Sequence, residues 1–359
     1  MTTAGNVTEH HNREHVLGAV LWVPISLFLI GAFAIFHASG FRHVAIDWNG
    51  YGTICAVLLA GYLVARGFRI RFIQAFLNGW LQNLIVAIAA TMLTYAAATV
   101  GRPLVDDQLL RADQLMGYDW MVFAAFFASS DLMVRIVTES YQSVFYLPSV
   151  VILCLAVKGD IATLEKFILA AIISLIITIA VFAVLPATTA WTHLGLSDTE
   201  VASFRTLPRS SEGWIDELIR IREGSLRSLH NFHGRGLIAF PSFHCVAALL
   251  LIWASWNVRW LRIPMALANL CMLVSTPLIG GHYLVDLIGG AVVTVVSVII
   301  AKQLHAWMLS WAAAFQRAAW LQPSASRIEA AVRRQRVSAI PRRPAPRPVR
   351  PAQRPRSRI

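Results

Sequence analysis

Eight apolar runs separated by short polar segments dominate the chain. They lie at about residues 16–38, 50–65, 80–100, 143–157, 166–186, 243–257, 262–280 and 283–304. Most of them approach the ~20 residues that a helix needs to cross ~30 Å of hydrocarbon. The pattern predicts an all-α fold, a polytopic integral membrane bundle of about eight transmembrane helices.

Two segments bear on that number. The first run is too long, and too weakly charged in front, for a cleaved signal peptide, so we expect a retained helix. The stretch DWMVFAAFFASSDLMVRIV is apolar but contains Asp131 and Arg135, four residues apart. Because charges that face lipid are costly, we expect an interfacial or partly buried helix with an i,i+4 ion pair. A ninth span is the alternative.

Composition supports a membrane protein with a distinct tail. The 359 residues are 57% hydrophobic and 14% charged, and the formal net charge is +12. The segment from Leu321 contains eleven arginines against one acid, Glu329. We expect a cytoplasmic segment at 1–15, a membrane domain at 16–320, and a disordered Pro- and Arg-rich tail at 321–359. The tail lacks aromatic residues that could stack on bases, so we expect it to bind anionic lipid headgroups and no nucleic acid.

The loop charges predict an orientation. Lys and Arg in short loops tend to stay cytoplasmic. The basic loops at 66–71, 158–166 and 259–262, together with the tail, can all lie on that side of an eight-span bundle. Loops 101–142 and 187–241 then face outward, and both termini are cytoplasmic.

Polar residues mark the mouths of two late runs, at FPSFH from Phe240 and at GGHYLVD from Gly280. One span down and one span up separate these stretches, so both lie at the same membrane face. Pro241 suits the first turn of a helix and Ser242 can cap it, while Gly281 lets the backbone approach a ligand closely. We expect both helix starts to bind one anion, such as phosphate.

Three of these residues favour catalysis at that mouth. His282 and Asp286 are four residues apart and share a helix face, so the carboxylate can orient the imidazole. This suits a nucleophilic histidine that attacks phosphorus, with His244 protonating the leaving oxygen. Each residue alone could be a cap, an interfacial histidine or a partner of a distant arginine. Polar residues in two clusters at one membrane face favour the catalytic interpretation.

The two stretches also resemble a known family. Pro-Ser-Phe-His at 241–244, and Ser-Thr-x5-His-x3-Asp at 275–286, are similar to the second and third signatures of the type 2 phosphatidic acid phosphatase and haloperoxidase superfamily. The likeness is to its inositol phosphorylceramide synthase-like, or inositolphosphotransferase, branch and covers roughly residues 140–304. It implies a six-helix phosphatase-like core and a phosphohistidine at His282, with Asp286 as its partner. It further implies His244 as general acid, Ser242 as a phosphate ligand alongside the close approach at Gly281, and no metal or other cofactor.

Two departures concern the phosphate pocket. Phe243 replaces a glycine of many phosphatases, and Thr276 replaces an arginine. The family's first signature, Lys-x6-Arg-Pro, has no clean match. The replacement cation is expected to be Arg227, with Arg235 as second choice.

Neighbouring residues are interpreted as ordinary surface. We expect Arg220 and Arg222 to be solvated, with Glu217 and Glu223 as partners. The same surface is expected to hold His230 and His233 at solvent or at an interface. The four cysteines lie inside apolar runs without the spacing of a zinc site, so neither a disulfide nor a metal cage is expected.

The combined hypothesis is a membrane enzyme that cleaves a lipid phosphate ester or phosphodiester and passes the phospho-headgroup to an alcohol or to water. Its expected partners are a lipid phosphate, membrane lipids and an alcohol acceptor. The expected place is a bacterial plasma membrane, with the active site on the outer face. The alternatives are a phosphatase acting on phosphatidic acid or polyprenyl diphosphate, a noncatalytic anion-binding membrane protein, and, least favoured, a haloperoxidase.

Overall fold

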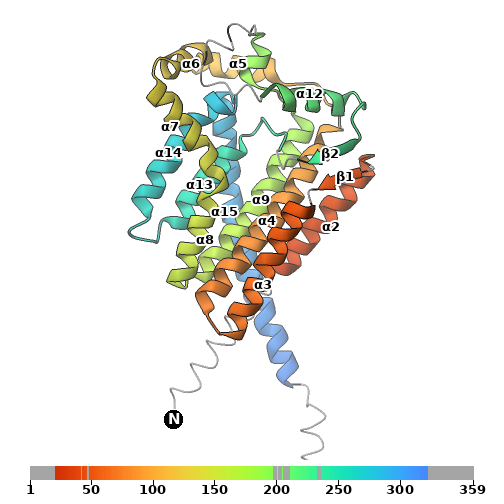
Figure 1. The fold of residues 1–359 in the computed structure, drawn as a ribbon, viewed down its shortest axis with the longest axis vertical. Coiled ribbons are helices and arrows are strands. Elements are labelled where there is room, and N and C mark those ends of the chain that lie inside the picture. Colours follow the sequence, from red (N-terminus) through yellow and green to blue (C-terminus); the bar gives the residue numbers. More distant parts are fainter. Residues whose placement is uncertain are drawn as a thin grey trace, which may run out of the picture. The chain divides into compact units, whose positions relative to one another are not determined.

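The computed structural model describes residues 21–41, 43–46, 48–196, 200, 204, 211–232 and 236–321, so the segment 1–15 and nearly all of the predicted tail lie outside the described residues. Eight apolar helices occupy the eight predicted runs. They are α2 (Trp22–Ala38), α3 (Thr53–Gly67), α4 (Arg71–Ala98), α8 (Leu147–Lys158), α9 (Ile161–Val184), α13 (Phe243–Ser255), α14 (Arg262–Ile279) and α15 (Leu284–Leu321). Figure 1 shows them running side by side as a bundle. The helical fold class is confirmed.

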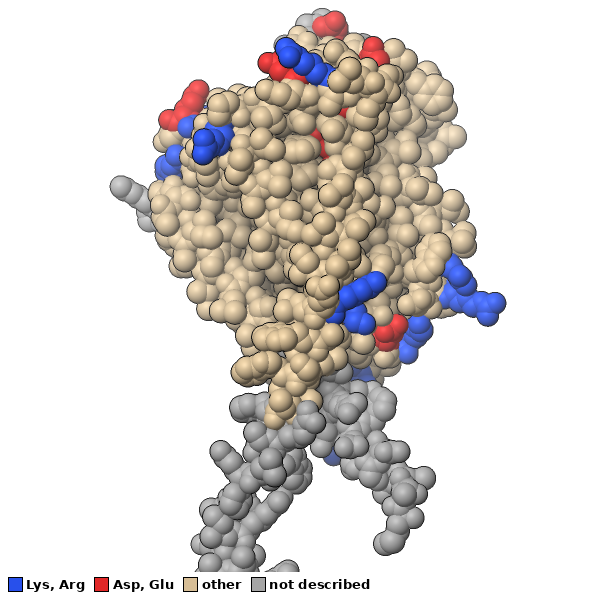
Figure 2. Space-filling view, turned by 180° about the vertical axis from the view of Figure 1, so that it is seen from behind, with Lys and Arg blue, Asp and Glu red and all other residues tan. Residues whose placement is uncertain are grey.

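Five of these helices, α3, α4, α9, α14 and α15, are long and apolar enough to cross a membrane in the described part of the chain. The apolar helices α2, α8 and α13 are shorter, at 17, 12 and 13 residues. Figure 2 shows Lys, Arg, Asp and Glu gathered toward two ends of one face, with a wide uncharged band between them. This distribution is typical of an integral membrane protein, because charged side chains in hydrocarbon are costly.

The ambiguous stretch forms two helices instead of the expected single one. α6 (Trp120–Ala128) and α7 (Asp131–Gln142) are bent by 114° at a short break, and the pair would raise the number of spans to six if it counts as one. Ser130 at the break has an extended backbone, which ends α6 and starts α7. α7 runs into a 3₁₀ turn, η2 (Ser143–Phe145), and packs on α14. Pairing of the Asp131 and Arg135 side chains stays a prediction.

Short elements lie mainly at one end of the bundle. They are η1 (Trp48–Gly52), α5 (Asp106–Leu115), α10 (Ala190–His193), α12 (Ser211–Arg222), β1 (His43–Ile46) and β2 (Ser228–Phe232). β1 and β2 form a parallel two-stranded sheet with His43 opposite Ser228, which the sequence analysis did not predict. In Figure 1, α5, α6 and α12 lie across the upper end of the bundle. α5 belongs to the long loop at 101–142, and α12 belongs to the long loop at 187–241. These two loops therefore form this end of the bundle.

In the bundle, α2, α3, α8 and α9 pack around α4. Close packing of α13 against α15 sets the geometry at the end that carries the two polar motifs. At Gly290 on α15, a Cβ atom would lie 2.6 Å from the carbonyl oxygen of Ser242. A larger residue would therefore push apart the two helix starts that carry the polar motifs.

Candidate active site

The two polar stretches meet, as their spacing predicts. His282 lies in the four-residue linker between α14 and α15, and its Nδ1 is 3.0 Å from Oδ2 of Asp286 on the first turn of α15. Both side chains are buried, with 3% and 0% of their surface exposed. Burial lowers the pKa of His282 to about 4, against the opposing effect of a backbone hydrogen bond with Ala239. The imidazole is therefore neutral at pH 7 and keeps a free electron pair.

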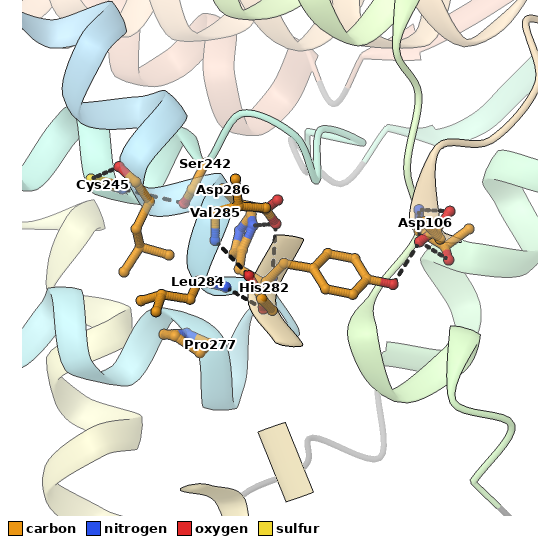
Figure 3. A network of polar contacts seen from close by, with 12 residues as sticks. Asp106, Ser242, Cys245, Pro277, His282, Leu284, Val285 and Asp286 are labelled. Atoms are coloured by element: carbon orange, nitrogen blue, oxygen red, sulfur yellow. Dashed lines mark hydrogen bonds and ion pairs between the residues drawn. The ribbon is translucent and has the colours of Figure 1, made fainter. Parts of the chain in front are cut away.

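Ser242 is the N-cap of α13. Its Oγ accepts a hydrogen bond from the Cys245 amide at 3.4 Å, and its own amide donates to the carbonyl oxygen of Asp286 at 3.1 Å. The capping role is confirmed, and the second bond ties the two motifs together (Figure 3). Pro241 precedes the cap instead of occupying the first turn, because the helix begins only at Phe243.

The start of α15 differs from the expectation. The Leu284 and Val285 amides donate to the carboxylate of Asp113 at 2.8 and 2.9 Å, and the Tyr283 amide donates to Asp286 at 3.0 Å. These amides were expected to be open to a bound anion. That prediction is wrong for α15, because protein carboxylates already accept their hydrogen bonds.

His244 lies on the first turn of α13, opposite His282. The two ring centroids are 6.4 Å apart and the planes are inclined by 59°. Tyr141 of α7 stacks on the His244 ring at 4.0 Å, with an angle of 18° between the planes. Among the described residues, Nε2 of His244 and Oδ1 of Asp286 are buried polar atoms without a hydrogen-bond partner. Buried polar atoms are usually paired, so these two atoms are candidate contacts for a ligand.

Gly281 is held in a left-handed conformation with φ of +66°. Its carbonyl oxygen accepts a hydrogen bond from the Ala190 amide at 2.7 Å, and a Cβ atom there would collide with the ring of Trp191. The glycine is therefore required by the turn and by the close approach of the α10 segment. Binding of a phosphate at Gly281 stays a prediction.

The expected cations are not brought to the histidines in the described part of the chain. The guanidinium of Arg227 donates to the carbonyl oxygens of Ile221 and Leu226 at 2.6 and 3.0 Å and lies over the Phe41 ring. Arg235 and His233 lie outside the described residues, as does the side chain of His230.

The two arginines of α12 differ from each other. Arg220 is exposed, as expected, but its partner is Asp216 at 3.8 Å. Arg222 is partly buried, and Nη2 donates to the carbonyl oxygen of Arg102 at 2.6 Å, while Nη1 is buried and has no partner among the residues that the structure describes. Burial lowers its pKa, and the charge of Asp106 opposes the shift. The prediction of a solvated Arg222 is wrong, because it follows the buried Ile221 where α12 contacts the α4–α5 loop.

Two site residues were missed from the sequence. Asp106 and Asp113 of α5 are both 2% exposed and lie seven residues apart, on the same helix face as the buried Leu109. Asp106 accepts hydrogen bonds from the Thr188 amide and hydroxyl and from the Tyr283 hydroxyl. The sequence did contain a sign of this burial. Asp106 and Asp113 fall on the helix face where the helical period places apolar residues such as Leu109.

The family model of the PAP2 superfamily matches residues 107–300, more than half of the chain. The chain belongs to the PAP2 superfamily. Neither the curated proteins nor the solved structures include a significant match to it. PAP2 membership indicates a phosphatase-type membrane enzyme that acts on phosphate esters.

The PAP2 signatures fit the structure unevenly. Thr276, at the position of the third-signature arginine, is fully buried and its hydroxyl donates to the carbonyl oxygen of Met272 at 2.8 Å. Arg102 and Pro103 follow Tyr95 at the spacing of the first signature, with tyrosine in place of lysine, and the sequence analysis overlooked this. Tyr95 donates to Glu217 at 3.1 Å, and Arg102 is exposed. Among the described residues, no cluster of three or more His, Cys, Asp and Glu could hold a metal ion.

Proposed function

We propose that this PAP2 protein cleaves a lipid phosphodiester through a phosphohistidine at His282 and transfers the phospho-headgroup to an alcohol, or to water when no alcohol is bound. The observation that carries the proposal is the His282–Asp286 pair facing His244, with 6.4 Å between the two imidazole ring centroids and no partner for Nε2 of His244 among the described residues. This arrangement supplies a nucleophile, its orienting carboxylate and a proton donor on the far side of one bound phosphate.

The first step uses both histidines. Nδ1–H of His282 donates to Asp286, which leaves the electron pair of Nε2 to attack phosphorus. The bond from phosphorus to the leaving oxygen breaks, and that oxygen takes the extra proton of His244, which enters this step in its protonated form. The Asp286 carboxylate stabilises the positive charge that develops on the His282 ring.

The second step reverses the roles. His244, now without its extra proton, accepts the proton of an incoming alcohol or water oxygen as that oxygen attacks phosphorus. The phosphorus–nitrogen bond of His282 breaks, and the electron pair returns to the ring. Tyr141, stacked on His244, holds the imidazole plane toward the phosphate in both steps.

The charges around the site favour a phosphodiester over a dianionic monoester. Asp106, Asp113 and Asp286 are buried and all accept hydrogen bonds from residues 283–285, and the Thr276 hydroxyl is turned to its own helix. Figure 3 shows Asp106 and Asp286 in this network. A diester carries one negative charge fewer than a dianionic monoester, so nearby carboxylates repel it less. Resemblance to the inositol phosphorylceramide synthase-like branch supports the same donor. The loop charges support a site on the outer face of the membrane.

The covalent step is tested with a donor lipid labelled at phosphorus. Wild-type protein quenched during turnover should carry acid-labile, alkali-stable label, and His282→Ala protein should carry none. His37→Ala is the matched control, because His37 is an exposed histidine on α2. Label that persists on His282→Ala protein would refute the nucleophile.

The donor and acceptor are tested in mixed micelles with purified protein. A phosphodiester lipid and phosphatidic acid are each supplied with and without a lipid or polyol alcohol, and free phosphate, released alcohol and new phospholipid are measured separately. We expect faster cleavage of the diester and a transfer product that grows with alcohol concentration. Rapid phosphate release from phosphatidic acid, unchanged by every alcohol, would make the protein a plain phosphatase.

A further inference from the structure

The helix α5 reaches the catalytic linker with two buried carboxylates. Asp113 accepts hydrogen bonds from the Leu284 amide at Oδ2 (2.8 Å) and from the Val285 amide at Oδ1 (2.9 Å). Asp106 lies two turns earlier on the same helix face and accepts a hydrogen bond from the Tyr283 hydroxyl at 3.1 Å. In Figure 3, dashed lines start from the labelled Leu284 and Val285 and from the labelled Asp106.

These bonds replace a cap that α15 cannot make for itself. The first amides of a helix lack partners within the helix, and a serine, threonine or aspartate at the N-cap usually accepts one of them. Here Tyr283 precedes the first residue of α15, and its side chain points to Asp106. Asp286 accepts a hydrogen bond from the Tyr283 amide, as the side chain of the third helical residue does in a capping box. Asp113, from a helix about 170 residues away in sequence, supplies the missing half.

We propose that Asp113 is a positioning residue for the proposed reaction: by capping α15 it fixes the direction of Asp286, and through Asp286 the plane and tautomer of His282. Asp113 makes no described contact with either histidine, so its effect passes through the backbone of residues 284 and 285. Asp106 acts on the same segment through the Tyr283 ring. The inference rests on the proposed function of His282.

The size of the effect follows from the geometry of catalysis. A displacement of about 1 Å at a reacting group can cost about 10²-fold in rate. Asp113→Ala removes both bonds to the α15 amides, and we expect kcat to fall about 10²-fold with KM within a few-fold. Asp113→Asn keeps one acceptor oxygen, and we expect a loss of about 10-fold. Asp107→Ala is the control, because Asp107 is exposed on the same helix, and its kinetics should be unchanged.

Single-turnover labelling separates positioning from folding. The amplitude of the covalent label counts active molecules, and its rate constant reports the geometry of each active molecule. Full amplitude with a slower rate in Asp113→Ala supports the proposal. A reduced amplitude at the wild-type rate, or no change at all, overturns it. If Asp113→Ala protein cannot be purified in folded form, the same comparison is made with Asp113→Asn.

A second readout does not depend on turnover. The Nδ1–H proton of His282 can be assigned by its absence from the NMR spectrum of His282→Ala protein. We expect its resonance to shift or broaden in Asp113→Ala and to stay in place in Asp107→Ala. An unshifted resonance in Asp113→Ala overturns the positioning role. Failure of the wild type to form a phosphohistidine would refute the proposed function, while this spectrum would still test the link from Asp113 to His282.

Discussion

Two histidine–carboxylate pairs lie at opposite ends of the segment 282–305, which includes the first part of α15. His282 and Asp286 are 3.0 Å apart at its start, and His305 and Glu165 are 2.8 Å apart at its other end. All four side chains are nearly completely buried. At ~1.5 Å rise per residue the segment from Leu284 to His305 is about 32 Å long, close to the ~30 Å of hydrocarbon in a bilayer.

The surroundings of the two pairs differ more than their distances do. His282 lies in a linker, faces His244, and shares its carboxylate with a backbone amide. His305 joins α15 to α9 from the middle of a helix, and Oε1 of Glu165 is buried without a partner in the described part of the chain. A short distance and deep burial therefore do not identify a catalytic histidine. We propose His282 as the catalytic residue because it has a free face toward a second functional group, and we interpret the His305–Glu165 pair as a contact that holds two helices together.

The sharpest test replaces the histidine at each end with the same residue. We expect His282→Gln to lower turnover by more than about 10⁴-fold, as loss of a catalytic nucleophile does elsewhere. His305→Gln should leave the turnover of folded protein within a few-fold. Activity per folded molecule, measured in detergent, decides between them, and equal losses at both ends would contradict the comparison.

The second histidine of the candidate site should show a smaller and more selective effect. We expect His244→Ala to lower turnover about 10²–10⁴-fold for a lipid alkoxide leaving group, the usual contribution of a general acid. An activated aryl phosphodiester needs little protonation and should lose much less. Rates for both substrates are compared in the variant and in wild type. Equal losses on the two substrates would exclude the acid role.

The pair at the other end should matter for stability instead. Removing one partner of a buried hydrogen bond costs about 1–3 kcal/mol because the other partner is left unsatisfied, whereas replacing both by apolar residues is often neutral. We therefore expect Glu165→Leu to lower the unfolding free energy by about that amount, and Glu165→Leu with His305→Leu to recover most of it. Thermal unfolding in detergent measures both. A double variant that also loses turnover would show that this pair serves the reaction.

The smallest effect is expected from the basic tail beyond α15. Truncation after Gln322 should leave activity in detergent within a few-fold, because its arginines are expected to contact anionic lipid headgroups, each contributing about 1 kcal/mol. Binding to vesicles with and without anionic lipid measures that contribution. A folded truncation that is inactive in detergent would place the tail in the active site.

Much of the bundle could be predicted because its causes are local. Each apolar run is long enough to form a helix, and all eight runs are helical. The pairing of His282 with Asp286 was predictable for the same reason, since four residues make one helical turn. The bend between α6 and α7 was missed, because an extended backbone at Ser130 does not follow from an apolar pattern.

The sequence by itself determined that the eight apolar runs are helical, that the two motifs lie at one end of the bundle, and which histidine has a carboxylate one turn away. Only the tertiary structure decided what surrounds them. Asp113 meets the α15 amides across 171 residues, and Glu165 meets His305 across 140. Such contacts depend on how helices pack, and helical periodicity reports only which face of a helix is buried, not which helix covers it.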